Sequence, residues 1–248
     1  MKGIILAGDS GSKLEHLTRG VPKQLLPIYD RPMIYYPIET LVDAGITDIL
    51  IITSPQYTAN FTSALGDGSV FGAHFTFAQQ IKPEGSAQAF TIGEDFLAKE
   101  PVCMITGDCI IFGKDRTKKL KKAIRAACKS GQATIFVIRD NDPSQYGIAK
   151  LDEKGKCKDV NGQTSDNSNY SITGLYVFPK GVANYAKIIE KSDRGRFEVT
   201  TIQKLFLDAN KLQAQTLGND YFWCDTNTVD NLLKASNYIK KNQTKKIW

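Results

Sequence analysis

The first third of the chain alternates between continuous apolar runs and helical spacing. Lys2–Ala7 and Asp48–Thr53 are apolar runs without the polar alternation of a half-exposed strand, so both are predicted to be strands buried on two faces of a parallel sheet. Between them, residues 34–45 carry apolar side chains at helical intervals and end at a glycine, which predicts a helix. Together these three segments predict a β-α-β unit.

The same alternation continues to about residue 106. Residues 75–78 and Val102–Thr106 are predicted to be strands. Residues 86–99 between them are predicted to form one helix that Ser86 caps. This half of the chain is therefore predicted to be a doubly wound α/β arrangement.

From Ala133 the apolar runs become shorter and turn residues separate them, which favours a mixed, more antiparallel arrangement. The predicted later elements are strands at 133–138, 146–151 and 170–178 and helices at 199–209 and 229–240. Before them, residues 115–130 predict an amphipathic helix with Leu120, Ile124 and Cys128 on one face. No repeat or low-complexity linker divides the chain, so residues 1–248 are predicted to form one domain.

Composition narrows the classes of protein. With 42% hydrophobic and 23% charged residues, the chain is an ordinary globular protein. A net charge of +6 is short of a dedicated nucleic-acid binder but suits an anionic small ligand. Five scattered cysteines without C-x-x-C spacing argue against a disulfide framework or a zinc site. No apolar run approaches the roughly 20 residues of a membrane helix, so the protein is predicted to be soluble and cytoplasmic.

The sequence GDSGSKL follows the first strand and raises the question of a phosphate loop. It lacks the second glycine of a dinucleotide fingerprint and the spacing of a P-loop. The missing glycine also disfavours a dinucleotide-dependent oxidoreductase. What remains is a turn in which Gly8 and Gly11 free backbone amides, Ser12 adds a hydroxyl and Lys13 a positive charge, although Asp9 would repel an anion. The sequence of this loop alone is compatible with two interpretations, an anion-binding nest and a plain tight turn.

Further motifs occur in order over nearly the whole chain: VPKQLLPI, QQIKPEGSAQA, TGDC, NDPSQYGIAKLDEKG, NYSITGLYVF, SDRGRFEVT and WCDTNT. In this order they resemble the sugar-1-phosphate nucleotidyltransferases, in particular short members that transfer a thymidylyl group. The resemblance implies a doubly wound mixed sheet of the nucleotide-diphospho-sugar transferase type. Residues 1–110 would form the nucleotide-binding half, and residues 111–248 a β-rich sugar-phosphate-binding half.

The resemblance also implies an activity. Such enzymes condense dTTP or UTP with a sugar 1-phosphate, release pyrophosphate and supply nucleotide sugars for surface polysaccharides; they use Mg²⁺ and form homo-oligomers. Their nucleophile is a phosphate oxygen that is largely ionised at pH 7, so no general base is needed. Catalysis instead requires a metal ion and several cations that hold two polyanions in line.

The residues at matching positions take these roles by resemblance. The catalytic positions are Lys13, Lys23 and Asp108, and the metal ligands are Asp108 and Asp225. The nucleotide-binding positions are Leu6, Gly8, Gly11, Ser12, Gln24, Gln80 and Gly85. The sugar-phosphate-binding positions are Gly147, Thr173, Arg194 and Glu198.

Departures from the family pattern concentrate at these positions. The substituted positions are Asp9 for a glycine, Lys13 for an arginine, Cys109 for an asparagine, Thr201 for an aspartate and Asn227 for a glycine. A lysine that grips the sugar phosphate has no counterpart in residues 158–170 beyond Lys158. Two hypotheses follow: an active, retuned nucleotidyltransferase, and a catalytically weakened homologue that binds a nucleotide or nucleotide sugar.

Overall fold

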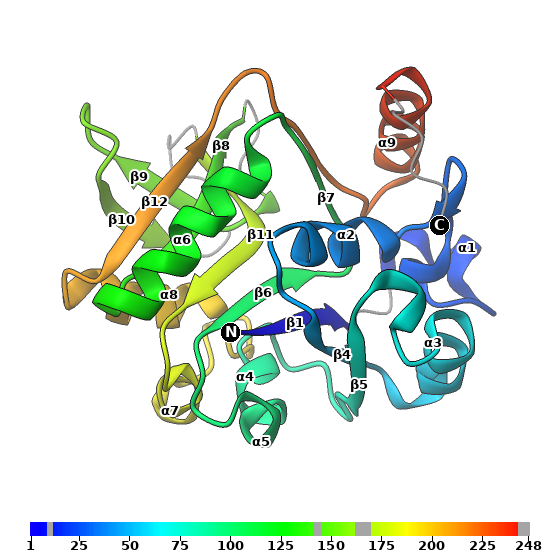
Figure 1. Ribbon diagram of the computed structural model, residues 1–248, viewed down its shortest axis with the longest axis horizontal. Coiled ribbons are helices and arrows are strands. Elements are labelled where there is room, and N and C mark those ends of the chain that lie inside the picture. The colour runs from blue at the N-terminus through cyan, green and yellow to red at the C-terminus, as the bar shows by residue number, and fades with distance from the viewer. Residues whose placement is uncertain (9–11, 141–144, 162–169, 243–248) are drawn as a thin grey trace.

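The computed structural model describes residues 1–8, 12–140, 145–161 and 170–242 (Figure 1). The strands are β1 (Lys2–Ala7), β2 (Pro27–Ile28), β3 (Arg31–Pro32), β4 (Asp48–Thr53), β5 (His74–Gln79), β6 (Val102–Thr106), β7 (Cys109–Phe112), β8 (Ala133–Arg139), β9 (Ile148–Leu151), β10 (Cys157–Asn161), β11 (Tyr170–Phe178), β12 (Leu212–Leu217) and β13 (Phe222–Asp225). The α-helices are α1 (Glu15–Thr18), α2 (Tyr35–Asp43), α3 (Thr58–Leu65), α4 (Gln88–Ile92), α5 (Glu94–Leu97), α6 (Arg116–Ser130), α7 (Val182–Ile188), α8 (Val199–Asp208) and α9 (Val229–Asn242).

Nine of the described strands form one mixed sheet that runs through both halves of the chain. Its order is β10-β9-β11-β6-β1-β4-β5, and β8 pairs with both β11 and β12. In the first half, β6, β1, β4 and β5 are mutually parallel. Strand β11 then runs antiparallel to β6, β8 and β9, so the direction changes where the two halves meet. The predicted doubly wound mixed sheet is confirmed, including the more antiparallel second half.

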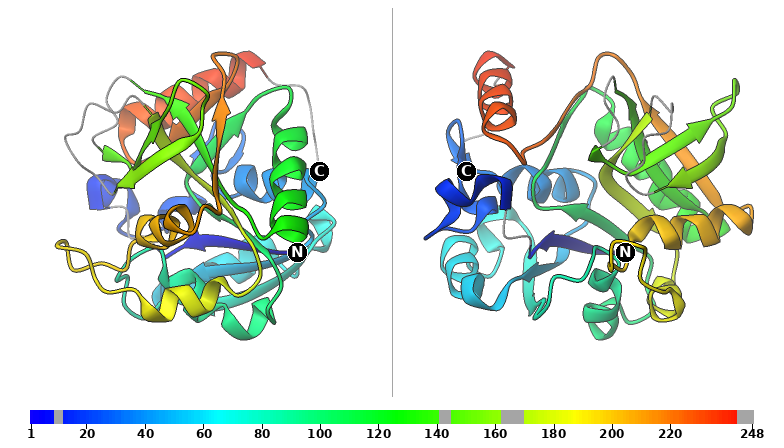
Figure 2. Two further views of the ribbon diagram at one scale, coloured as in Figure 1. Left: turned by 90° about the vertical axis from the view of Figure 1, so that its left-hand side faces the viewer. Right: turned by 180° about the vertical axis from the view of Figure 1, so that it is seen from behind.

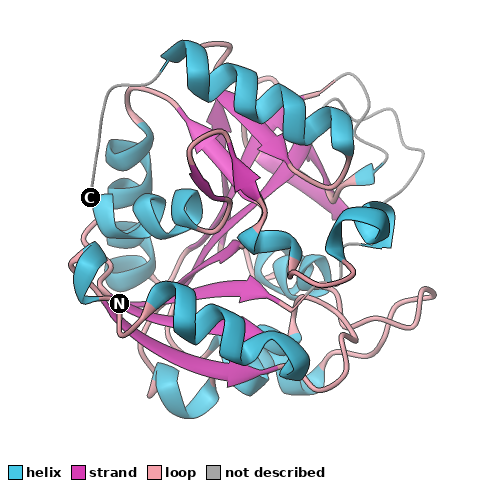
Figure 3. Cartoon of the chain, turned by 90° about the vertical axis from the view of Figure 1, so that its right-hand side faces the viewer, coloured by secondary structure: helices cyan, strands magenta, loops and turns pink. Residues whose placement is uncertain are grey.

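Helices cover both faces of this sheet because its strands are apolar on both sides (Figure 3). Ile4 packs with α4, α7 and α8 on one face, whereas its neighbour Ile5 packs with α2, α3 and α6 on the other. Figure 1 looks onto the α2 and α6 side, and the right panel of Figure 2 shows the yellow and gold α7 and α8 on the opposite side. Among the described residues, no helix combines the length and apolarity required to cross a membrane.

A third, smaller core lies beside the main sheet. Strands β7 and β13 form a separate antiparallel pair, and α9 packs on it together with β2. An ion pair from Arg116 at the start of α6 to Asp43 at the end of α2 spans 2.8 Å and links neighbouring helices. Asp108 directly precedes β7 and Asp225 is the last residue of β13, so this strand pair brings the two predicted metal ligands together.

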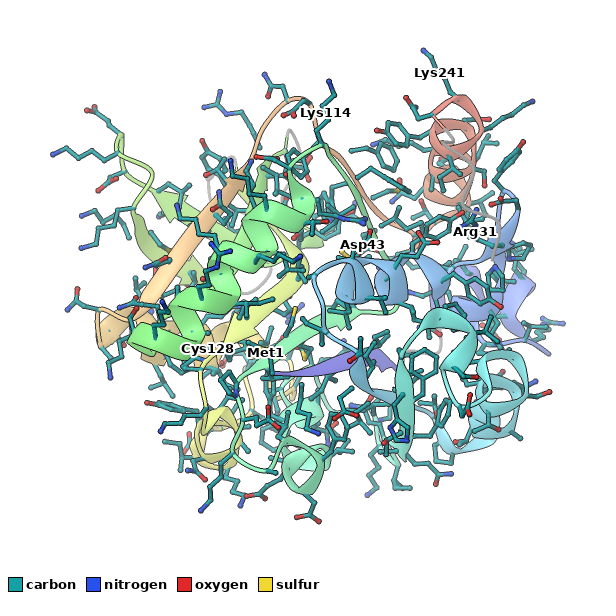
Figure 4. The ribbon with its side chains drawn as sticks, in the orientation of Figure 1. Met1, Arg31, Asp43, Lys114, Cys128 and Lys241 are labelled. Carbon is teal, nitrogen blue, oxygen red and sulfur yellow. The ribbon has the colours of Figure 1, made fainter. Side chains whose placement is uncertain are left out.

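Three local predictions were wrong. Residues 86–99 do not form one helix, because α4 ends and α5 begins at Gly93, whose Cα packs so tightly that a Cβ would lie 2.9 Å from Leu50. The Ser86 hydroxyl does not cap its own helix; it accepts a hydrogen bond from Val199 N of α8 at 3.3 Å. On α6, the buried face is Leu120, Ala123 and Ala127, so Cys128 is exposed (Figure 4).

Helix α4 is held by an aromatic contact that can be tested. Phe90 is fully buried, and its ring meets that of Phe178 edge-on at a centroid distance of 5.2 Å. We expect Phe90→Ala to lower the free energy of unfolding by about 3–5 kcal/mol in urea denaturation, because it removes a large core side chain. Val70→Ala, at a side chain that is 71% exposed, should stay within about 0.5 kcal/mol of the parent. A Phe90→Ala loss no larger than the Val70→Ala loss would contradict this packing.

Candidate active site

The carboxyl ends of the parallel strands bring distant residues to one edge of the sheet. Gly8 follows β1, Gln80 follows β5, and Asp108 follows β6 by two residues. Because β6, β1, β4 and β5 are parallel and adjacent, their carboxyl ends lie along the same edge. In open sheets of this kind ligands bind at that edge.

Lys23 forms a buried ion pair with Asp108. Its Nζ lies 2.5 Å from Asp108 Oδ2 and also donates a hydrogen bond to Asn227 Oδ1. Lys23 is fully buried and Asp108 is 8% exposed, so both charges lie in the interior. Burial alone would raise the pKa of Asp108, but the Lys23 ammonium holds that pKa below its ordinary value. The carboxylate is therefore ionised beside a buried cation.

Asp225 lies next to Asp108 through strand pairing. In the β7–β13 pair, Asp225 stands opposite Cys109, the residue after Asp108. The next residue, Thr226, donates its hydroxyl to the Asp108 carbonyl at 3.1 Å. Burial, followed by the charges of Asp108 and Asp225, raises the pKa of the Cys109 thiol well above its ordinary value. Cys109 is thus a neutral donor, and its Sγ contacts the Thr173 carbonyl at 2.8 Å.

Four of the predicted nucleotide-binding residues, Leu6, Gly8, Gln24 and Gln80, lie near the carboxyl ends of β1, β5 and β6. A Cβ at Gly8 would lie 2.5 Å from Gln80 Oε1, so only glycine leaves room for this side chain. Leu6 accepts the backbone hydrogen bond of Gly107 at 2.9 Å, and Gln24 packs against Gly107. Gln24 is 1% exposed, and within the described ranges nothing donates to its Oε1.

Gly85 is required by a contact between the two halves. Its φ is +129°, and a Cβ there would lie 2.3 Å from the Phe197 carbonyl oxygen. Phe197 N donates to Glu84 O at 2.7 Å, and Ala87 N donates to Phe197 O at 3.0 Å. The loop that carries Gly85 is therefore paired with the loop before α8.

The loop before α8 carries two of the four predicted sugar-phosphate residues, Arg194 and Glu198. The Arg194 guanidinium donates to Glu198 Oε1 at 2.7 Å, and the Ser192 hydroxyl donates to the same oxygen at 3.3 Å. Gly147 lies close by, because a Cβ at that position would meet the methyl group of Thr200 at 3.1 Å. The structure thus brings Arg194, Glu198 and Gly147 into one region.

The Thr173 hydroxyl points into the protein, unlike the predicted sugar-phosphate residues Arg194 and Glu198. This hydroxyl donates to the Phe136 carbonyl of β8 at 3.0 Å, and the residue is buried. Its carbonyl accepts hydrogen bonds from Cys109 Sγ and, at 3.0 Å, from Trp223 Nε1. Thr173 therefore anchors Trp223 rather than directing a hydroxyl into an open space.

An aromatic pair that the sequence analysis did not assign lies beside Asp225. The Tyr146 and Trp223 rings meet edge-on with centroids 4.8 Å apart. Both rings line a pocket of about 490 Å³ that also includes Asp225 and Lys234. The sequence held a signal for this pair, because Tyr146 directly precedes Gly147 and Trp223 lies two residues before Asp225, each within a motif of the resemblance.

Lys13 is exposed, and its Nζ donates to Gln145 Oε1 at 3.0 Å, which links the first loop to the second half of the chain. Gly11 and Asp9 lie outside the described residues, as do the Ser12 side chain and residues 162–169, where the family lysine has no counterpart.

Comparison with known proteins defines the class. Residues 2–242 match the model of the nucleotidyl transferase family, and the chain belongs to that family. Glucose-1-phosphate thymidylyltransferase of Xanthomonas campestris pv. campestris (strain B100) is 44% identical over 243 residues, which cover 98% of this chain and 81% of the relative. The enzyme of that name from Neisseria gonorrhoeae is 43% identical over 244 residues, covering 98% and 84%.

Solved structures confirm the predicted fold type. A Bacillus anthracis protein in complex with sucrose, provisionally named a glucose-1-phosphate thymidylyltransferase, has a TM-score of 0.88 and 31% identity, covering 99% of this chain and 98% of that one. A UDP-glucose pyrophosphorylase complexed with UDP-glucose has a TM-score of 0.83 at 22% identity, covering 97% and 99%, and shares the fold.

The buried ion pair predicts a large stability effect. Lys23→Met leaves the Asp108 carboxylate buried without its ammonium partner, so we expect a loss of about 3–5 kcal/mol in the free energy of unfolding, measured in EDTA. Adding Asp108→Asn should recover part of that loss, because the unpaired charge is then removed. The control is Lys187→Met, which breaks an exposed 2.6 Å pair with Glu94 and should cost less than about 1 kcal/mol. Equal losses in the free energy of unfolding for Lys23→Met and Lys187→Met would show that burial does not strengthen the Lys23–Asp108 ion pair.

The close approach at Gly85 gives a second prediction. We expect Gly85→Ala to destabilise the fold and to weaken dTDP binding measured by calorimetry, because its Cβ forces the 84–87 segment away from Phe197. The matched control is Gly155→Ala, where φ is +76° but the space around the Cβ is open. It should show only the backbone strain of about 1–2 kcal/mol and unchanged binding. Identical behaviour of the two variants would mean that the Phe197 contact is unimportant.

Proposed function

We propose that the protein transfers a nucleotidyl group from dTTP or UTP to a sugar 1-phosphate and releases pyrophosphate. The observation that carries the proposal is the common sheet edge at which Gly8, Gln80 and the Lys23–Asp108 pair lie, with Asp225 on the adjoining strand pair. The family membership and the names of the relatives support the same reaction. The product would be a nucleotide sugar, in keeping with a role in surface-polysaccharide synthesis.

The chain's residues would act by positioning and charge. The attacking phosphate oxygen is already ionised near neutral pH, so no side chain has to remove a proton. Lys23 and Lys13 would meet the phosphates of the nucleotide, and the buried Gln24 Oε1 would accept a hydrogen bond from a nucleotide hydroxyl. On the other side, Arg194 would exchange its contact with Glu198 for the sugar phosphate, and Glu198 would then accept from sugar hydroxyls.

The same residues suit Mg²⁺. Asp108 and Asp225 supply carboxylate oxygens from adjacent backbone positions, which are the ligands that Mg²⁺ prefers. In the described part of the chain no group of three or more His, Cys, Asp or Glu residues could hold a metal, so we infer that the two carboxylates share the ion with substrate phosphates and water. A bound Mg²⁺ would neutralise the charge that develops on the α-phosphate and the leaving pyrophosphate. The cytoplasmic location and the homo-oligomer remain predictions.

A second candidate is a weakened homologue that binds a nucleotide or nucleotide sugar. It is favoured by the contact of Lys23 with Asn227, a residue that departs from the family pattern. This hydrogen bond occupies the Lys23 ammonium, which would otherwise be available to a substrate phosphate. Tight binding of a dTDP-sugar in calorimetry without turnover would support this candidate over the first.

The deciding experiment is a matrix of nucleotides and sugar 1-phosphates. We expect pyrophosphate release from dTTP or UTP with at least one of several sugar 1-phosphates in Mg²⁺, and its loss on adding EDTA. No release above the blank across the whole matrix would overturn the transferase proposal.

Lys13 provides a matched test within the active site. We expect Lys13→Met to lower kcat by about 10²–10³, because it removes a cation that faces the charge of the transition state. Lys129→Met, at an exposed lysine in the last turn of α6, should leave kcat unchanged. If Lys13→Met retains the parental kcat, Lys13 does not contact the reacting phosphates.

A further inference from the structure

Three side chains next to Gly85 form a hydrogen-bond chain that the proposed reaction has not used so far. Gln80 Nε2 donates to Gln88 Oε1 at 2.7 Å and to the Gly85 carbonyl at 3.2 Å. Gln88 Oε1 also accepts from the backbone N–H of Glu84 at 2.9 Å, and Gln88 Nε2 donates to Glu84 Oε2 at 3.3 Å. Gln80 is 4% exposed, so its amide is almost entirely enclosed.

The directions of these bonds fix which end of each amide is which. A backbone N–H can only donate, so the Gln88 atom that meets Glu84 N must be its oxygen. That oxygen is also the atom that faces the Gln80 amide, so the Gln80 atom at this contact must be the NH₂ group. The oxygen of Gln80 is consequently turned the other way, toward Gly8 at the end of β1.

Glu84 fixes the second end of Gln88. Its other carboxylate oxygen lies 2.6 Å from Lys191 Nζ, and this hydrogen bond lowers the pKa of Glu84. An ionised carboxylate only accepts, so it also requires the NH₂ group of Gln88 on its side. A flip of the Gln88 amide would therefore break three hydrogen bonds, because it would face donors with donors at Gln80 Nε2 and Glu84 N and an acceptor with an acceptor at Glu84 Oε2.

We propose that Gln88 is a positioning residue that holds Gln80 with its oxygen toward the nucleotide site and thereby selects bases with a ring N–H. This inference rests on the proposed function, because it assigns the base choice of that same site. Thymine and uracil carry a hydrogen at N3, which an amide oxygen can accept. Cytosine has an unprotonated N3, which needs a donor. An amide locked with its oxygen forward therefore favours thymine or uracil and rejects cytosine.

The test compares dTDP and dCDP binding by calorimetry in the full chain with Mg²⁺. The variant Gln88→Met keeps the length of the side chain but removes its acceptor and donor. We expect the preference for dTDP over dCDP to fall by about fivefold or more, the equivalent of one net hydrogen bond of about 1 kcal/mol. We also expect dCDP to bind more tightly than it does to the parent, because a freed Gln80 can turn its NH₂ group to the cytosine N3.

Two further variants separate positioning from mere support of the fold. The double variant Glu84→Gln with Gln88→Glu exchanges the two side-chain types. Position 88 then still offers an oxygen to Gln80 Nε2 and to the backbone N–H of residue 84, and position 84 offers it an NH₂ group instead of a second carboxylate. We expect this double variant to keep the parental preference within about twofold. Gln79→Met is the matched control at the last residue of β5, next to Gln80 in the chain. The Gln79 amide donates to Thr58 Oγ1 at 3.1 Å instead, so this variant should change nothing.

The outcomes are distinguishable. If Gln88→Met weakens dTDP and dCDP equally, or leaves their ratio unchanged, the positioning role is wrong while the proposed transferase stands. If the parent protein binds neither nucleotide and releases no pyrophosphate, both are overturned. A lower ratio in Gln88→Met with a retained ratio in the double variant Glu84→Gln with Gln88→Glu supports the inference.

Discussion

The site depends on a charge buried where three segments of the chain meet. Lys23 comes from the turn after Pro22, Asp108 follows β6, and Asn227 follows β13, and all three meet at the Lys23 ammonium. An unpaired ammonium in the interior would cost several kcal/mol, so the fold is stable only when the segments converge. The same contact places one predicted metal ligand and one predicted phosphate contact side by side. Stability and site geometry are therefore set by one interaction.

A second link joins the two substrate regions. The Gly85 loop and the Phe197 loop exchange two backbone hydrogen bonds, and Lys191 reaches Glu84 across the same gap. Backbone bonds of this kind fix the relative position of their segments more firmly than flexible side chains do. The part of the chain proposed to read the base is thus held against the part proposed to grip the sugar phosphate. An in-line reaction between two bound polyanions requires such a fixed separation.

The sequence predicted the elements whose own residues determine them. Lys2–Ala7, Asp48–Thr53 and Val102–Thr106 were predicted with the observed bounds, because strands buried on both faces are continuous apolar runs. Strands β7 and β13 were missed, since they are short and each depends on pairing with a segment over 100 residues away. The burial of Lys23 was also missed for this reason, because its partners Asp108 and Asn227 are distant in sequence. Resemblance assigned the candidate site residues, but it could not give their orientations.

Those orientations change how the site's charges should be counted. Each described cation predicted to meet a phosphate already has a partner: Lys23 has Asp108, Arg194 has Glu198, and Lys13 has Gln145. Under the proposed function, substrate binding would be an exchange of partners, and its free energy would be the difference between two paired states. The loss of one family cation matters less to binding than a simple count suggests. The missing cation would matter more in the transition state, because the charge that develops there on the reacting phosphates is not present in the ground state and no protein group is already paired with it.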